Sequence, residues 1–154
     1  MKGNSEVVQH LNKLLANEQS AFNQYMLHSQ LLKSWGIEKM AKAERVEAME
    51  EVGHAEQLID RVLYLEGTPK VEGGRPAQMS ADLREILKCN LELEVVGIAD
   101  LREGIAVAQR TGDAICRELM VKILADEEHH EDHLQTQLSL IDKIGLENYI
   151  AAQL

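Results

Sequence analysis

The chain has 154 residues, 45% of them apolar, which is long enough to bury a substantial hydrophobic core. Its formal net charge of −10 argues against a nucleic-acid partner, because binding phosphates requires clustered Lys and Arg, and it suits cations instead. Only two prolines and 3% aromatic residues, with abundant Leu, Ala and Glu, predict an all-α fold.

The first two predicted helices form a hairpin, and each carries an acidic residue in its apolar stripe. The first is predicted over residues 5–34, with Ser5 as its N-cap and Glu18 among apolar residues at three- and four-residue steps. The second is predicted over residues 38–65, with Glu51 and His54 on its apolar face. Both helices therefore direct polar side chains toward the expected core.

Residues 66–79 form the long break in the pattern and contain both prolines. Connections in helix bundles usually have about two to eight residues, so this one is long. Fully extended at roughly 3.3 Å per residue it spans about 45 Å, enough to run back along the bundle. We therefore predict one long crossover and a parallel second and third helix.

The second half of the chain repeats the pattern of the first. A third helix is predicted over residues 81–110, begun by Ser80, and a fourth over residues 113–143. A short fifth helix over residues 146–153 keeps apolar side chains although four helices already close a bundle, which predicts subunit contact. We expect a single domain over residues 1–154, a four-helix bundle with a short fifth helix.

Three polar residues recur at an offset of 76 positions, so that each half-chain offers one isolated Glu and one Glu-x-x-His. Residues equally far from a hairpin turn lie side by side, here about 16 residues or roughly 25 Å down each helix. Both predicted hairpins therefore bring these residues level. The two sets are Glu18, Glu51 and His54, and Glu94, Glu127 and His130.

Carboxylate and imidazole groups in this number predict a centre for two metal ions. Residues i and i+3 project from one helix face, so each Glu-x-x-His can hold one metal, while the isolated glutamates bridge or cap. Four carboxylates in an apolar interior repel one another, and two divalent cations balance their charge. The alternative is that these are solvated acids on helix surfaces, as most Glu residues are.

Other polar residues near the predicted site have two interpretations each. Tyr25, two turns beyond Glu18, is either a redox-active neighbour or a core residue. Glu50 and Asp126 are hypothetical partners of the histidines, or solvent-facing acids. His129 and His133 are predicted on the surface, and the absence of His-Glu-x-x-His disfavours a zinc protease.

Over essentially its whole length the chain resembles a bacterioferritin. The resemblance implies a ferritin-like fold and a shell of twenty-four subunits that oxidises Fe(II) with dioxygen or peroxide at a di-iron ferroxidase centre, two irons per subunit, and stores ferric mineral inside. Its six ligands would be the residues of the repeat. The resemblance is carried by Met1-Lys2-Gly3, Leu11-Asn12-Lys13-Leu14-Leu15, Asn17-Glu18, Asn23-Gln24-Tyr25, Leu27-His28, Leu65-Glu66-Gly67 with Pro69, Asp126-Glu127-Glu128 with His130, and Ile144-Gly145-Leu146-Glu147-Asn148-Tyr149.

The chain departs from the bacterioferritin pattern at the haem position. The family binds haem b between two subunits through a methionine directly after the Glu of the first Glu-x-x-His, where this chain has Val52. We therefore expect no haem in a shell of this chain alone, unless Met49 substitutes or a second subunit type supplies the methionine. The family's inner-surface histidine is also replaced, by Val46.

Two other functions remain open. One is a di-iron oxidoreductase without a storage role, which a roomy apolar pocket beside the metals would favour; the other is a subunit of a mixed, haem-containing cage. Cys89 and Cys116 lack CxxC spacing and are expected to be reduced thiols, and no stretch approaches the ~18 apolar residues of a membrane span. We expect a cytoplasmic protein with no membrane partner.

Overall fold

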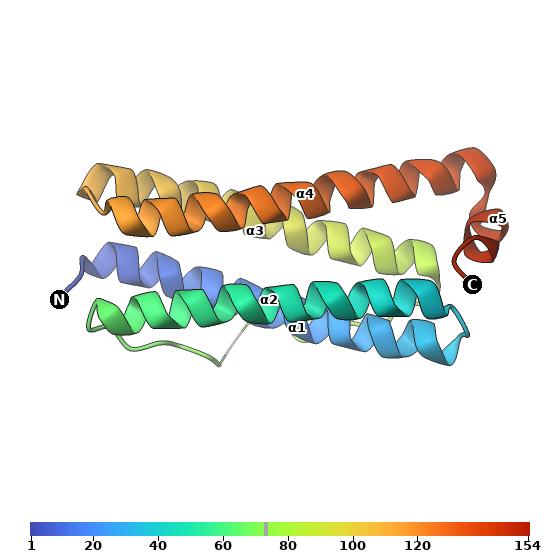
Figure 1. Ribbon diagram of the computed structural model, residues 1–154, viewed down its shortest axis with the longest axis horizontal. Coiled ribbons are helices and arrows are strands. Elements are labelled where there is room, and N and C mark those ends of the chain that lie inside the picture. Colours follow the sequence, from blue (N-terminus) through green and yellow to red (C-terminus); the bar gives the residue numbers. More distant parts are fainter. Residues whose placement is uncertain (73) are drawn as a thin grey trace.

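The computed structural model describes residues 1–72 and 74–154, so residue 73 of the predicted connection lies outside the described residues. The described chain is helical, as predicted, with no strand in these ranges (Figure 1). None of its helices combines the length and apolar character that a membrane span requires. The helices are α1 (Ser5–Ser34), α2 (Glu38–Tyr64), α3 (Leu83–Thr111), α4 (Ala114–Ile144) and α5 (Leu146–Ala151).

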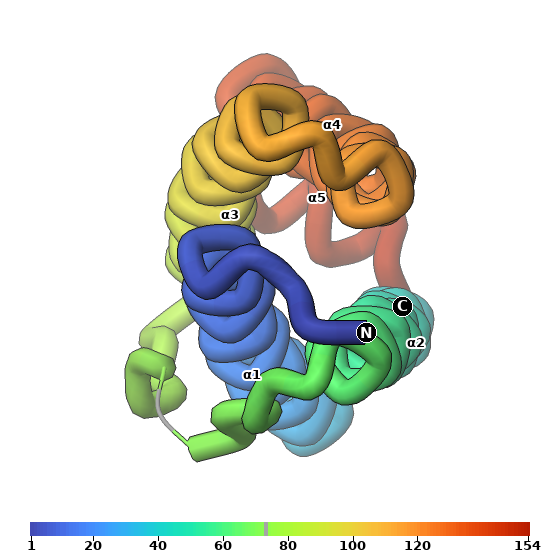
Figure 2. Tube along the Cα trace, turned by 90° about the vertical axis from the view of Figure 1, so that its left-hand side faces the viewer, coloured from blue at the N-terminus to red at the C-terminus, as the bar shows by residue number. Residues whose placement is uncertain are grey.

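The four long helices pair as two hairpins, α1 with α2 and α3 with α4, and α1 also packs against α3 (Figure 2). Two buried apolar clusters lie along the bundle. One includes Leu11, Leu58 and Met120, and the other includes Leu32 and Leu87. The predicted site residues, at mid-helix, belong to neither cluster, so a polar layer lies within an otherwise apolar core.

The connection between α2 and α3 runs along α1, which confirms the predicted crossover. Three backbone N–H groups donate to α1 side chains in order along that helix: Lys70 to Asn12 (2.8 Å), Arg75 to Ser20 (2.7 Å) and Gln78 to Gln24 (2.8 Å). The connection therefore travels in the direction of α1, and α2 and α3 are parallel (Figure 1).

Several helix boundaries differ from the predicted ones by one or two residues, and two capping residues differ from those predicted. Asn4, not Ser5, caps α1, since its Oδ1 accepts from the N–H of Glu6 at 2.9 Å. Similarly Asp82 caps α3, whereas Ser80 is buried against α1. The remaining differences are the end of α2 at Tyr64, the start of α4 at Ala114 after the cap Asp113, and the ends of α3, α4 and α5 at Thr111, Ile144 and Ala151.

The short helix α5 folds back onto its own chain. Tyr149 is 3% exposed and its hydroxyl donates to Gln137 Oε1 at 2.5 Å, so part of the apolar tail is covered within one subunit. Leu154 remains 73% exposed. The prediction of subunit contact therefore concerns the last residues of the chain rather than Tyr149.

Candidate metal centre

All six residues of the repeat point into the centre of the bundle. Glu18 comes from α1, Glu51 and His54 from α2, Glu94 from α3, and Glu127 and His130 from α4. Their exposed fractions run from 1% for Glu51 and Glu94 to 6% for Glu18 and His130. The alternative that these are solvated surface acids is therefore excluded.

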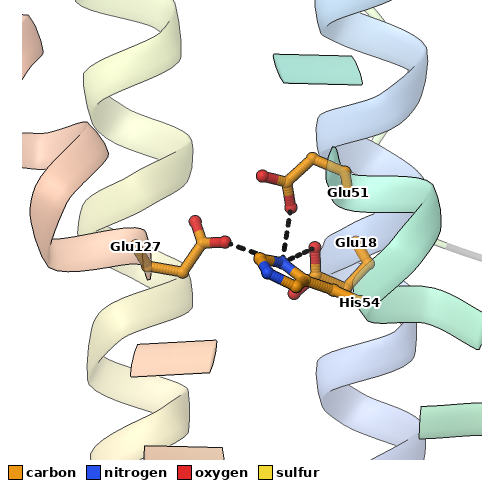
Figure 3. Close-up of side chains that lie close together, drawn as sticks. All are labelled: Glu18, Glu51, His54 and Glu127. Atoms are coloured by element: carbon orange, nitrogen blue, oxygen red, sulfur yellow. Dashed lines mark ion pairs between the residues drawn. The ribbon is translucent and has the colours of Figure 1, made fainter. Parts of the chain in front are cut away.

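One half of the cluster surrounds the Nδ1 atom of His54 (Figure 3). This nitrogen lies 3.6 Å from Glu18 Oε2, 3.7 Å from Glu51 Oε2 and 3.1 Å from Glu127 Oε1. One ligand atom from each of the four residues lies within 4.8 Å of the others. Such a group can hold one cation.

The other half of the cluster surrounds the Nδ1 atom of His130. It lies 3.7 Å from Glu51 Oε1, 3.6 Å from Glu94 Oε1 and 3.9 Å from Glu127 Oε2. Glu51 and Glu127 thus belong to both groups and offer one oxygen to each side, whereas Glu18 and Glu94 belong to one group each. The isolated glutamates therefore lie at the ends, and the glutamates of the two Glu-x-x-His pairs occupy the shared positions.

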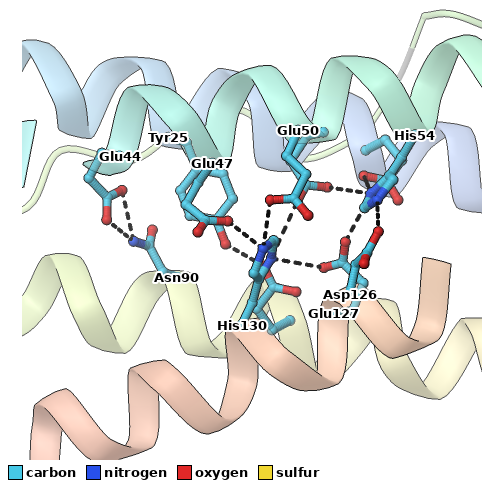
Figure 4. A network of polar contacts seen from close by, with 12 residues as sticks. Tyr25, Glu44, Glu47, Glu50, His54, Asn90, Asp126, Glu127 and His130 are labelled. Atoms are coloured by element: carbon cyan, nitrogen blue, oxygen red, sulfur yellow. Dashed lines mark hydrogen bonds and ion pairs between the residues drawn. The ribbon is translucent and has the colours of Figure 1, made fainter. Parts of the chain in front are cut away.

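The far nitrogen of each histidine is held by acids on the outer side of the cluster (Figure 4). His54 Nε2 donates to Asp126 Oδ2 at 2.8 Å, and His130 Nε2 donates to Glu50 Oε2 at 3.1 Å. The hypothesis that Glu50 and Asp126 are histidine partners is confirmed, and each serves the histidine of the other hairpin. These bonds direct both Nδ1 atoms inward, which is the orientation a metal ligand needs.

The unsatisfied atoms of the cluster fit a cation. Each of the six residues has one buried oxygen or nitrogen without a hydrogen-bond partner within the described chain: Glu18 Oε2, Glu51 Oε1, His54 Nδ1, Glu94 Oε2, Glu127 Oε1 and His130 Nδ1. Buried polar atoms are normally paired, and six orphans converging on one place indicate a missing partner of positive charge. Carboxylate and imidazole donors suit iron among the first-row metals.

The electrostatics of the cluster lead to the same conclusion. Burial raises the pKa of the Glu18 and Glu51 carboxyl groups and that of Glu127. Burial alone would lower the pKa of the His54 imidazole, but the surrounding carboxylates, Glu127 first, raise it well above its ordinary value. The cluster therefore holds protons that a divalent cation displaces, and its metal affinity should rise with pH.

Comparison with known proteins gives the family. The family model for the ferritin-like domain matches residues 8–144. The chain is 40% identical to the bacterioferritin of Brucella melitensis over 97% of its own length and 92% of that protein. The chain belongs to the bacterioferritins, within the ferritin-like family. It is also 41% identical to the bacterial ferritin of Synechocystis sp., over 100% of this chain and 99% of the relative, and 38% identical to the bacterioferritin of Mycobacterium bovis, over 98% and 95%.

In this bacterioferritin Tyr25 is both a core residue and a partner of the centre. Its ring is 1% exposed, and its hydroxyl donates a short hydrogen bond to Glu94 Oε1. Burial, followed by the negative charge of Glu94, raises the pKa of the phenol. The hydroxyl therefore stays protonated and fixes one oxygen of Glu94.

The position expected to ligate haem lies on α2. Val52 is partly buried, and Met49, one turn earlier, is 50% exposed. The exposed Val46 lies on the same helix. The expectation that a shell of this chain alone lacks haem b stays a prediction.

The sequence patterns did not identify two acids of α2 that lie near the centre. Glu47 Oε2 lies 2.6 Å from His130 Nε2, and Glu44 is buried at 5% exposure beside Asn90. Neither residue has an acidic counterpart 76 positions later, so the repeat did not reveal them. The signal that could have revealed Glu44 is its spacing of seven residues from Glu51, which places both side chains on one face of the helix.

Proposed function

We propose that this protein is an iron-storage ferroxidase, which binds two Fe(II) ions per subunit and stores the oxidised iron as mineral inside a shell of twenty-four subunits. The observation that carries this proposal is the six orphaned ligand atoms, shared between two overlapping groups of four residues. Membership of the bacterioferritins supports iron as the metal.

The residues of the chain have separate tasks in this function. Glu51 and Glu127 would bridge the two ions, and Glu18 and Glu94 would close the ends. The imidazoles of His54 and His130, oriented by Asp126 and Glu50, would each bind one ion through Nδ1. These side chains would bind and orient the ions, and the electrons would come from iron.

The proposed reaction balances with either oxidant. Two Fe(II) lose one electron each; dioxygen takes both electrons and two protons to give hydrogen peroxide. If hydrogen peroxide is the oxidant instead, it takes the two electrons from two Fe(II) and two protons, its O–O bond breaks, and two water molecules form. Protons displaced when Fe(II) binds to the buried carboxyl groups are available for this step.

We further propose that the shell works in the cytoplasm, without a nucleic-acid or membrane partner. Cys89 and Cys116 are free thiols, which suits a reducing compartment, and the charge of −10 disfavours nucleic acid. Because Val52 stands at the haem-ligand position, a variant of this proposal is a mixed shell, in which another subunit supplies the haem methionine.

The proposal is tested by removing ligands one at a time. Glu18→Ala and Glu127→Ala should abolish rapid Fe(II) oxidation, followed by absorbance after mixing with Fe(II) in air, while sizing chromatography shows an intact shell. Glu128→Ala, at an exposed position of α4, is the matched control and should oxidise normally. Normal rates in both ligand variants would reject the centre, and a purified protein of subunit size would reject the storage shell.

A further inference from the structure

A cavity of about 330 Å³ lies beside the centre, between α2 and α4 and next to α5. It is large enough for a small molecule. The residues that line it and matter here are Tyr25, Glu44, Glu47, Asn90, His130 and Tyr149.

Two of the side chains that line this cavity also contact Glu94 of the candidate centre. His130 lines the cavity, and its Nδ1 atom lies 3.6 Å from Glu94 Oε1 on the other side. Tyr25 also lines the cavity and donates its hydroxyl proton to Glu94.

The most deeply buried acid that lines the cavity, Glu44, is paired with an amide. Asn90 Nδ2 donates to both oxygens of Glu44 at 2.9 Å, and burial raises the pKa of that carboxyl group to about 8. Glu47 lies against His130 Nε2 at 2.6 Å. Apolar side chains, among them Leu87 and Leu134, line much of the remaining wall. The cavity suits an uncharged guest.

A chain of hydrogen bonds fixes Glu44 in this position, and Figure 4 shows its last link, from Asn90 to Glu44. The Gln24 amide is oriented by the backbone of Gln78, so its NH₂ group donates to His28 Nε2 at 2.8 Å. His28 therefore donates from Nδ1 to Asn90 Oδ1 at 2.9 Å, and the Asn90 NH₂ group is left for Glu44. The carboxyl group is thus held away from the centre, and the cavity keeps its volume.

A much smaller opening lies on the α1–α3 side of the centre. A recess of only about 10 Å³ between α1 and α3 is lined by four carboxyl groups of the cluster and by Asn17. The carboxyl groups are those of Glu18, Glu51, Glu94 and Glu127.

From its position beside the centre and the apolar part of its wall, we infer that the cavity beside His130 binds the oxidant, a small uncharged molecule such as dioxygen or hydrogen peroxide. The inference rests on the proposed ferroxidase function. It places the oxidant in this cavity, so that the volume of the cavity controls the use of oxidant and leaves iron binding unchanged.

The first test fills the cavity from two walls. Ala43→Trp on α2 and Leu134→Phe on α4 both add volume at lining positions, and Ala99→Trp at an exposed position of α3 is the matched control. At saturating Fe(II), the filled variants should show an apparent KM for the oxidant raised about fivefold or more, equivalent to roughly 1 kcal/mol of binding. Anaerobic Fe(II) binding should equal that of the wild type.

The second test uses xenon on the unaltered assembled protein. Xenon under pressure should occupy the cavity in a crystal and should compete with dioxygen in the oxidation assay. Xenon absent from the cavity, or bound there without competition, would overturn the inference, as would an unchanged KM in the filled variants. A change in KM for dioxygen alone or for peroxide alone identifies the oxidant. A wild-type protein that does not oxidise Fe(II) rejects the proposed function itself, whereas normal oxidation without these effects rejects only the oxidant site.

Discussion

Asp126 of α4 accepts a 2.8 Å hydrogen bond from His54 of α2, so an acid of the second hairpin orients a candidate ligand of the first. Glu50 of α2 accepts in the same way from His130 of α4 at 3.1 Å. Each hairpin therefore positions the imidazole of the other. The inward direction of both Nδ1 atoms depends on how the two hairpins dock, and not on either hairpin alone.

This relationship predicts that Asp126→Asn weakens metal binding although the residue is not a ligand. The amide cannot accept the His54 proton as strongly, and loss of such a partner typically costs about tenfold or more in metal affinity. Zn(II) titration by calorimetry measures the effect. Asp132→Asn, at an exposed position of the same helix, is the control. Equal affinities of the two variants would show that Asp126 does not position His54.

The shared and terminal glutamates should behave differently when neutralised. Glu18→Gln leaves the four residues around His130 intact, so one Zn(II) per subunit should still bind tightly. Glu127→Gln removes a member of both groups, and the affinity of both sites should fall about tenfold or more, or roughly 1.4 kcal/mol each. Calorimetric stoichiometry distinguishes the two results. If both variants lose one site and keep the other, Glu127 is not a bridge.

Glu44 should make stability depend on pH. Its pKa is raised from 4.5 to about 8 in the folded protein, because the carboxyl group is buried. As pH rises through this window the unfolded chain ionises while the folded one keeps the proton, so stability is lost, by about 1.4 kcal/mol for each unit of pKa difference. Glu44→Gln imitates the protonated form, and its advantage in Tm over the wild type should grow between pH 5 and pH 9.

The control for this pH series is Glu56→Gln, which removes the same charge from an exposed position of α2. Its Tm should differ from that of the wild type by a constant amount across the series. Metal-free protein is required in both arms, because bound cations change the titration of the neighbouring centre. A Glu44→Gln curve parallel to the wild-type curve would mean that the folded Glu44 carboxyl group titrates normally.

The sequence predicted the fold and the six central residues because both depend on short-range periodicity. Apolar residues at steps of three and four fix which face of each helix is buried, and the turns at Gly36 and Gly112 place Glu18 level with Glu51 and Glu94 level with Glu127. Helix starts were less accurate, because Asn4 and Ser5 are both good N-caps and only the backbone decides between them.

The roles within the site could not be read from the sequence. Which glutamates are shared depends on the rotation of each helix about its axis and on the offset between the hairpins, and a spacing of three or 76 residues contains neither quantity. Glu47 illustrates the limit: its contact with His130 crosses from α2 to α4, and its counterpart in the repeat is Ile123. The cavity beside His130 depends on side chains from five helices and has no local signature.

The crossover supplies a last prediction, because Gly74 lies close against α1. This glycine has a φ of +79°, and a Cβ atom there would lie 2.3 Å from Ser20 Oγ and 2.7 Å from Ala16 O. Gly74→Ala should therefore destabilise the protein by about 1–3 kcal/mol and lower its Tm.

Gly53→Ala is the matched comparison. A Cβ atom at Gly53, inside helix α2, meets nothing within 4 Å, so this substitution should stabilise the protein by roughly 0.5–1 kcal/mol. Thermal unfolding of the two metal-free variants measures the direction of the change in Tm for each. A Tm for Gly74→Ala at or above that of the wild type would show that the connection does not lie against α1 in solution.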